Sequence, residues 1–297
     1  MKNDYEWEEE FKEKHALSLR YLNDNLRKLI EKYENGEDLE NTLGTFRSLI
    51  TYPGLEYEII EYFCLHEKDE LRSRVATRIF LPNNLLEWLS RDRTAMVRVM
   101  VGRHRYVTES ILERLSHDED KRVRLVVIKN EKTPSHVLEE MIEKEREKEL
   151  VEAILCNYQT PEHVLRKFAH FEDDECKIAI AKNANTPVDI LEEFSKGKNI
   201  EVKRFVAINR NTTIDILEKL SKEQNNSIRE FVAMNPKTLT HRLVELATDE
   251  DRSVRVRVAT NPSTPIEIVK RLCEDHDPEV RKWAYKAITE WRNETEI

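Results

Sequence analysis

Apolar residues recur along the chain in a pattern that repeats every 26 residues. If the slot of Asn261 is called position zero, valine, isoleucine, leucine or cysteine fills position −7, and valine or isoleucine fills position −3, in each repeat. Leucine or valine fills position +8, and leucine, methionine or phenylalanine fills position +11. A fixed period of this length is the signature of a repeat architecture. The other residues in the zero slot are Arg78, His104, Asn130, Asn157, Asn183, Asn209 and Asn235.

Each repeat predicts two short helices. Positions −7, −4 and −3 form one face of a first helix, and a favoured N-cap stands ten residues before zero in most repeats, as at Asp251. The second helix starts at Thr-Pro, as at Thr264-Pro265, where threonine caps the free amides and proline takes the first helical position. Helices of about ten residues are marginal alone, so we expect the repeats to stack. The predicted fold is an all-α solenoid.

The register of the repeats divides the chain into residues 1–38 and 39–297. Residues 4–34 are expected to form an amphipathic capping helix, followed by a linker at 34–38. One degenerate repeat comes next, then eight clear repeats from about residue 69, and a terminal helix from Asp277 to about residue 291. One side of the capping helix carries Leu22, Leu26, Leu29, Ile30 and Tyr33. The expected core positions of the degenerate repeat are Leu49, Tyr52, Ile60 and Phe63.

The repeat sequence resembles a known family. The pattern is clearest at 251–265, DRSVRVRVATNPSTP, and it resembles the leucine-rich repeat variant, a relative of HEAT-type helical repeats. The resemblance implies a right-handed α-solenoid of paired helices, one of which can be a 3₁₀ helix. Some members carry an N-terminal iron–sulfur segment with clustered cysteines. Here Cys64 is the only cysteine among the first 150 residues, so no cofactor is expected.

Composition narrows the class of protein. No window approaches 18 uncharged apolar residues, and the N-terminus is acidic without an apolar signal region, so a cytoplasmic protein without a membrane span is expected. The formal net charge of −9 disfavours nucleic acid as a partner, although it leaves room for a local basic face. Four distant cysteines predict free, buried thiols: Cys64, Cys156, Cys176 and Cys273.

One basic column is the candidate binding site. Position −6 holds arginine or lysine in every repeat except the one with Val151. A row of like charges is unfavourable unless something neutralises it. The column is therefore either an internal ladder, in which each residue bonds a capping Asp or loop carbonyl of an adjacent repeat, or a basic stripe open to an acidic partner or a phosphate backbone. Its members are Arg72, Arg98, Arg124, Lys177, Lys203, Arg229, Arg255 and Arg281.

Other recurrent residues favour structure over chemistry. The asparagines of the zero column face inward at a helix C-terminus, where we expect them to bond loop amides and carbonyls as a structural ladder. They are Asn130, Asn157, Asn183, Asn209, Asn235 and Asn261. His136, His163 and His241 share one position, but a metal site would need a further ligand, so none is expected. No phosphate-binding glycine loop, GxSxG or HExxH motif is present, and no catalytic residue is assigned.

These features predict a non-catalytic binding scaffold that holds a protein partner, as yet unidentified, on its concave face. The alternative is a nucleic-acid-binding HEAT-like groove, similar to that of DNA-repair glycosylases, in which the −6 column faces the duplex unpaired. A third hypothesis is an enzyme whose site is built from non-repeating residues. The state of the −6 side chains, paired or open, separates the first two.

Overall fold

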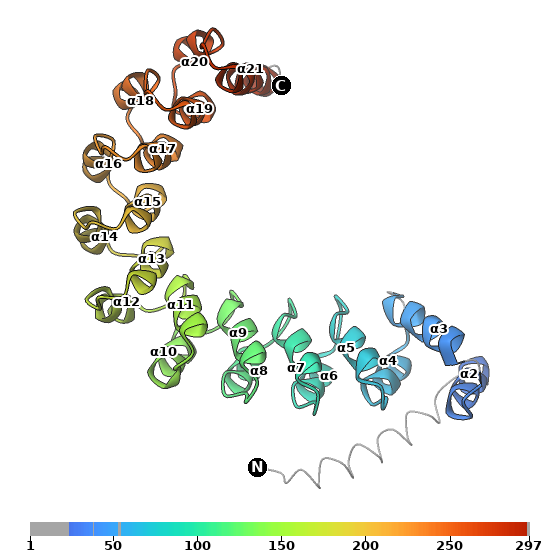
Figure 1. Ribbon diagram of the computed structural model, residues 1–297. Helices are drawn as coiled ribbons and strands as arrows, with labels where there is room; N and C mark the ends of the chain where they lie inside the picture. Colours follow the sequence, from blue (N-terminus) through green and yellow to red (C-terminus); the bar gives the residue numbers. More distant parts are fainter. Residues whose placement is uncertain (1–23, 38, 53–54, 296–297) are drawn as a thin grey trace. The chain divides into compact units, whose positions relative to one another are not determined.

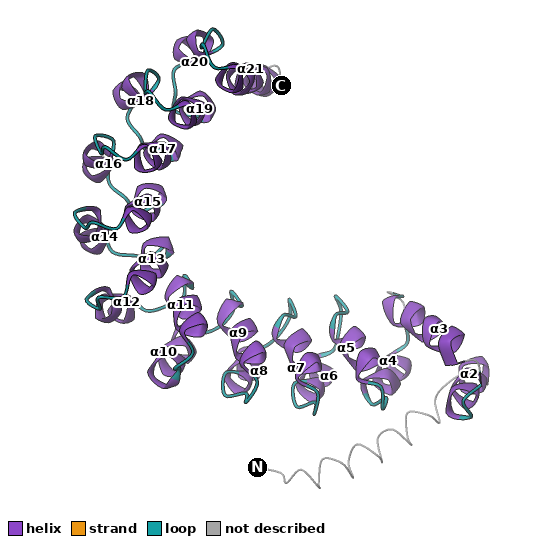
Figure 2. Cartoon of the chain, in the orientation of Figure 1, coloured by secondary structure: helices purple, strands orange, loops and turns teal. Residues whose placement is uncertain are grey.

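The computed structural model describes residues 24–37, 39–52 and 55–295. All regular structure in these ranges is α-helical, and short loops join the helices (Figure 2). The chain forms two compact units, Met1–Glu145 and Arg146–Ile297. The boundary lies within the one repeat of 27 residues, between Asn130 and Asn157, and the apolar pattern does not predict it.

Unit 1 contains the described part of the capping helix, the degenerate repeat and the first clear repeats. Its helices are α2 (Asp24–Glu34), α3 (Leu39–Thr51), α4 (Tyr57–Cys64), α5 (Asp69–Ala76), α6 (Asn83–Leu89), α7 (Ala95–Gly102), α8 (Glu109–Leu115), α9 (Lys121–Lys129) and α10 (Ser135–Lys144).

Unit 2 continues the same alternation. Its helices are α11 (Lys148–Cys156), α12 (Glu162–Ala169), α13 (Asp174–Lys182), α14 (Val188–Ser195), α15 (Ile200–Ile208), α16 (Ile214–Leu220), α17 (Asn226–Met234), α18 (Thr240–Leu246), α19 (Arg252–Thr260), α20 (Ile266–Leu272) and α21 (Pro278–Thr295).

Within each unit, the first helix of a repeat packs against the first helix of the next, as α15 does on α17 and α17 on α19. Most first helices also contact the second helix of their own repeat, as α15 does α16 and α19 does α20. In unit 2 the first helices lie on the inner side of the arc and the second helices on its outer side (Figure 1). The described helices therefore form an all-α solenoid of two-helix repeats, as predicted. The hand of the superhelix stays a prediction.

The apolar columns form the core. The residues at −7, −3 and +8 are buried in all the clear repeats, and those at +11 are buried except Phe168, which is half-buried. Burial of one such side chain contributes roughly 1.5–3 kcal/mol. This continuous core explains why helices as short as seven residues are stable here, since each is held by its neighbours.

The N-terminal elements follow the prediction in part. Leu26, Ile30 and Tyr33 of α2 are buried against the first repeat, which agrees with a capping role. Leu22 and the rest of residues 4–23 lie outside the described residues. In the degenerate repeat Ile60 and Phe63 are buried as expected.

The expected register of the degenerate first helix is wrong. Tyr52 is 62% exposed and Leu49 is only half-buried, whereas Phe46 and Ile50 fill the core. The helix α3 has 13 residues, compared with eight in α5, and its buried face is displaced by one residue along the chain.

The hinge between the paired helices also differs from the prediction. Pro265 is itself the N-cap of α20, because its carbonyl accepts hydrogen bonds from Ile268 and Val269. Thr264 lies one residue earlier, and its hydroxyl donates to the carbonyl of Val258 at 2.6 Å. Threonine therefore satisfies a free carbonyl at the end of the first helix, and does not cap the second.

The N-caps of the first helices are as predicted at most positions. The Asp251 side chain accepts a hydrogen bond from the amide of Ser253 at 2.7 Å, while Thr94 makes no such bond. Of the cysteines, Cys64, Cys176 and Cys273 are buried and burial raises the pKa of Cys176 to about 11. The expectation of a buried thiol is wrong for Cys156, which is exposed.

Candidate functional site

The arginines at position −6 are bonded within the chain. Arg229 donates from Nε and Nη2 to the two carboxylate oxygens of Asp249, twenty residues later, at 2.7 and 2.9 Å. Its Nη1 donates to the carbonyls of Glu223 and Gln224 at 2.9 and 2.8 Å. This bonding raises the pKa of Arg229. The same two-bond geometry joins the pairs Arg72–Asp92, Arg98–Asp118 and Arg255–Asp275.

The remaining members of the column do not form this two-bond pair with an aspartate. Arg124 bonds Glu145 at 3.0 Å, 21 residues later, in the repeat that is one residue longer. Lys203 bonds Glu223 at 2.5 Å. Arg281 donates from Nη1 to the carbonyls of Asp275 and His276 at 2.7 and 3.0 Å. Lys177 has Gly197 at the position twenty residues later, where the ion-paired members of the column have their acid.

Six of the eight candidate stripe residues are therefore ion-paired inside the molecule. The open basic stripe is corrected to an internal ladder at these positions. The sequence predicted the N-caps at −10 as the pairing acids. The acids that pair are instead the residues at −12, two positions earlier. Their recurrence was visible in the sequence as a separate column. These acids are Asp92, Asp118, Glu145, Glu223, Asp249 and Asp275.

The zero-column asparagines form a second internal ladder. Asn209 donates from Nδ2 to the carbonyls of Ala181 and Asn183 at 2.7 and 2.8 Å, and its Oδ1 accepts from the amide of Asn211 at 2.8 Å. Asn130, Asn183, Asn235 and Asn261 also bond a carbonyl 28 residues earlier. Asn157 makes the bond within its own loop, because its Oδ1 accepts from the amide of Gln159 at 2.7 Å.

Two non-asparagine residues perform the same function in unit 1. His104 is buried, its Nε2 lies 2.6 Å from the carbonyl of Arg78, and its Nδ1 accepts from the amide of Tyr106 at 3.1 Å. Nε2 must therefore carry the proton. Arg78 bonds the carbonyls of Ile50 and Tyr52 in the preceding repeat.

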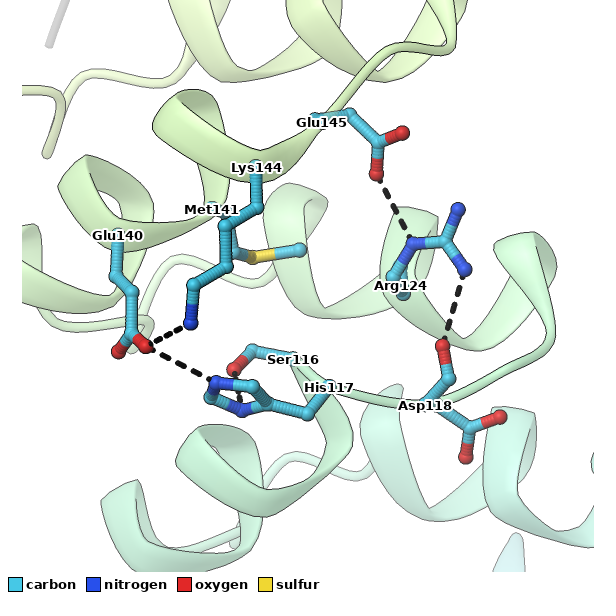
Figure 3. Close-up of a pocket in the computed structure, with 8 residues that line it drawn as sticks. All are labelled: Ser116, His117, Asp118, Arg124, Glu140, Met141, Lys144 and Glu145. Carbon is cyan, nitrogen blue, oxygen red and sulfur yellow. Dashed lines mark hydrogen bonds and ion pairs between the residues drawn. The ribbon is translucent and has the colours of Figure 1, made fainter.

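A shallow pocket of about 280 Å³ in unit 1 lies over the Arg124–Glu145 pair (Figure 3). The Glu140 carboxylate accepts from Lys144 at 2.5 Å and lies 3.2 Å from His117 Nε2. The charged groups in this pocket are thus engaged with one another. The pocket at Arg255, Asp275 and His276 in unit 2 occupies the same place in its repeat, so such pockets belong to the repeat geometry.

Neither a metal cluster nor a membrane-spanning helix is present among the described residues. They contain no group of three or more His, Cys, Asp or Glu side chains placed to hold a metal ion. None of the helices in these ranges combines the length and the apolar character needed to cross a membrane.

The first helices of unit 2, which lie on the inner side of its arc, carry a row of accessible apolar side chains. Ile208 and Met234, at position −1 of α15 and α17, are each 39% exposed. Phe205 and Phe231, at position −4, are half-buried and meet edge to face, with ring centroids 6.4 Å apart. These four residues are called the inner apolar row. The large apolar residues at −1 were a sequence signal of this surface, because the other clear repeats have lysine, arginine, threonine or, at Cys156, cysteine there.

Cations cover the two rings of this row. Lys182 Nζ lies 4.3 Å from the centroid of Phe205, and the Arg204 guanidinium lies 4.3 Å from that of Phe231. Arg204 is also paired with Glu201. Cation–π contacts of this kind contribute roughly 0.5–1 kcal/mol at exposed sites. The row therefore combines apolar surface with positive charge.

The fold thus defines the class of molecule, an α-solenoid of two-helix repeats. A leucine-rich repeat variant described as having a novel repetitive structural motif is similar, with 20% identity and a TM-score of 0.44 over 79% of this chain and 88% of that chain. Two engineered proteins are also similar. One has 14% identity and a TM-score of 0.32 over 90% of this chain and 98% of its own, and the other 15% and 0.23 over 82% and 95%. No protein-family model and no curated protein matches the sequence.

Proposed function

We propose that the chain is a non-catalytic binding scaffold and that it holds a protein partner on the inner apolar row of unit 2. The observation that supports this most is the grouping of Phe205, Ile208, Phe231 and Met234 on two adjacent first helices, with the two aliphatic side chains accessible. Contiguous accessible apolar groups mark interaction surfaces, and helical-repeat proteins bind along such faces.

The charges around the row indicate the chemistry of the partner. Lys182 is exposed at one end of the row, and Arg210 and Lys237 are exposed on the loops that follow α15 and α17. No acid occupies positions −1, +1 or +2 of the repeats centred on Asn183, Asn209 and Asn235. An amphipathic segment with acidic residues beside its apolar ones would match this arrangement.

Pairing of the polar groups supports a binding role over a catalytic one. The two recurrent polar columns are bonded within the chain, the arginines to carboxylates and backbone carbonyls and the asparagines to backbone groups, and the pocket in Figure 3 holds paired charges. A catalytic group needs a free donor, acceptor or nucleophile directed at a substrate. The alternative of nucleic-acid binding through the −6 column loses its support, because six of those side chains are paired.

The test is quantitative capture with the full chain. Proteins crosslinked to it in cells of its source are identified, and the affinity of the purified partner is then measured. We expect Ile208→Asp with Met234→Asp to weaken binding at least about tenfold, the equivalent of ~1.4 kcal/mol. Ile214→Asp with Ile266→Asp is the matched control, since these residues are 45% and 39% exposed on the second helices. Equal losses in both variants, or undiminished binding by the first, would contradict the proposal.

A further inference from the structure

A groove in unit 1 contains a positive charge without a compensating acid. The groove measures about 740 Å³ and is lined by Leu55, Tyr57, Ile60, Arg78, Phe80 and Tyr106, among others. Arg78 donates to the carbonyls of Ile50 and Tyr52, and its Nε atom has no hydrogen-bond partner within the described ranges. Desolvation lowers the pKa of Arg78, and no carboxylate in the described residues pairs with it. An anion in the groove would stabilise this guanidinium.

Two aromatic rings at the edge of the groove are accessible. Phe80 is 73% exposed and Tyr106 is 43% exposed, although large aromatic side chains are usually buried. Their centroids are 6.2 Å apart and the ring planes differ by 19°. The rings thus present nearly parallel faces, on which another planar π system can stack.

Basic side chains lie close to the Tyr106 ring. The Arg105 guanidinium and the Lys132 ammonium lie 5.9 and 5.7 Å from the centroid of Tyr106. Arg103 and Lys129 are also exposed, and they occupy position −1 of the same two repeats. In the part of the chain that the structure describes, none of these four side chains forms an ion pair, and Glu131 is the only acid at positions −1, +1 and +2 of these repeats. The edge is therefore basic, although the chain has a net charge of −9.

We propose that this surface binds single-stranded nucleic acid. Unpaired bases stack on Phe80 and Tyr106, and Arg78, Arg105 and Lys132 neutralise backbone phosphates. The surface is named the aromatic–basic patch and consists of Arg78, Phe80, Arg105, Tyr106 and Lys132. It lies in a different unit from the inner apolar row and takes a different class of ligand, so the two proposals stand independently.

The features of the patch favour this ligand over others. The bases of a duplex are stacked on one another, so a duplex could contact only the basic side chains. Accessible rings favour a ligand whose bases are free to stack on them. A free nucleotide would fill the groove but would leave the cations of the next two repeats unused. An acidic peptide would satisfy the charges without needing two nearly parallel ring faces.

The experiment measures binding of a short fluorescent oligothymidylate and oligouridylate to the full chain by anisotropy at several salt concentrations. We expect Phe80→Ala to weaken binding at least about fivefold, because the variant loses a ring on which one base stacks. We expect Arg105→Glu with Lys132→Glu to weaken it further and to lower the slope of log K against log salt by about 0.7 for each phosphate that is no longer neutralised. Phe80→Ala should leave that slope unchanged.

Matched variants distinguish a specific effect of the patch from the effects of changed net charge and of impaired folding. Arg93→Glu with Lys121→Glu makes the same charge change in unit 1 at exposed positions near the N-terminal ends of α7 and α9, and Tyr285→Ala removes a ring that is 58% exposed in unit 2. Both should bind like the wild type, and circular dichroism should show the same melting for all variants. Four results would each overturn the proposal: no binding at low salt, an equal loss in the control pair, equal affinity for duplex, or equally strong competition by polyglutamate.

Discussion

Arg255 and Asp275 form a buried, two-bond ion pair between successive repeats. Nε donates to one carboxylate oxygen at 2.8 Å and Nη2 to the other at 3.1 Å, and the two side chains are only 4% and 7% exposed. Arg255 Nη1 also donates to the carbonyls of Asp249 and Glu250 in the preceding turn. One guanidinium therefore joins three segments of unit 2.

Removing the acid should be costly, because it leaves a buried charge without its partner. We expect Asp275→Asn to lower the free energy of unfolding by about 3–5 kcal/mol, measured by urea denaturation. Replacing both residues, as in Arg255→Met with Asp275→Leu, should cost less than the sum of the single changes. The control in the same helix is Arg257→Met, which breaks the more exposed pair with Glu230 and should cost less than about 1 kcal/mol. Similar losses for Asp275→Asn and Arg257→Met would refute a special role for the ladder.

The ladder lacks an acid opposite Lys177, and this gap can be filled. Gly197 occupies the position of the pairing aspartates, and its φ angle is not positive, so a side chain is compatible with its backbone. An aspartate there could accept from the guanidinium that Lys177→Arg introduces and also from the amide of Asn199, as Asp275 does from Asp277 at 2.8 Å. We expect Lys177→Arg with Gly197→Asp to raise the free energy of unfolding by about 1–3 kcal/mol.

Either substitution alone should raise the free energy of unfolding little or should lower it. Lys177→Arg alone has no carboxylate at the position of Gly197, and the new Cβ of Gly197→Asp alone approaches the carbonyl of Phe194 at 3.2 Å. A double-mutant cycle from denaturation midpoints measures the coupling. Additive effects of the two changes would show that the bidentate pair had not formed.

The core of the solenoid could be predicted from the sequence because burial depends on helical periodicity. Val254, Val258, Val269 and Leu272 stand at the spacing of one buried face on each helix, and all four are buried. The same logic is wrong at Tyr52, where the zero slot of the degenerate repeat contains an exposed ring. The length of α3, and not its apolar content alone, determines which face meets the core.

The candidate site was harder to predict, because it depends on the register between repeats. The sequence placed acids at −10 and −12 in the same repeats, and only the packed structure shows that the guanidinium of Arg229 reaches Asp249 at −12 while the acid at −10 caps the next helix. The aromatic–basic patch depends on Phe80 and Tyr106 meeting across 26 residues. Both residues stand at position +2 of their repeats, but the later repeats have polar residues there, so no recurrent aromatic column signalled the patch.

Asn209 should be intolerant of change. Its amide group supplies the donor for two buried carbonyls, and Asn209→Ala leaves these carbonyls without that partner. We expect a loss of about 1–3 kcal/mol in the free energy of unfolding. Asn211→Ala is the control, because that more accessible side chain also bonds two carbonyls, those of Ala184 and Thr186. A smaller loss for Asn209→Ala than for Asn211→Ala would contradict the burial argument.

Asn209→Asp should add a dependence on pH. The new carboxylate would face carbonyl oxygens in a buried position, which raises its pKa above that of the unfolded chain. The protonated acid can donate a hydrogen bond, so the variant should be most stable below the unfolded pKa of about 3.9 and lose stability as the pH rises through the folded pKa. Urea denaturation of the variant and the wild type across this range measures the difference, and a constant difference would refute the orientation of the amide.

His104 should make the stability of unit 1 sensitive to pH. Desolvation lowers its pKa below the ordinary value of 6.5, outweighing the hydrogen bond to the Arg78 carbonyl, and its Nδ1 must stay unprotonated to accept from Tyr106. The folded state therefore prefers the neutral ring. Its contribution to stability should be fully present above pH 6.5 and decline as the pH falls toward the folded pKa.

Asparagine at this position tests the assignment directly. His104→Asn introduces the residue that bonds the equivalent carbonyl, 26 residues earlier, at Asn183, Asn209 and Asn261, so we expect the ladder to persist and the loss of stability below pH 6.5 to shrink. His170→Asn is the control, since this histidine is exposed, and it should leave the pH profile of the wild type unchanged. Denaturation midpoints between pH 5 and 8 provide the comparison, a range that spans the titration of a histidine. If both variants keep the wild-type profile, another group causes the pH dependence and the neutral tautomer of His104 has no measurable role.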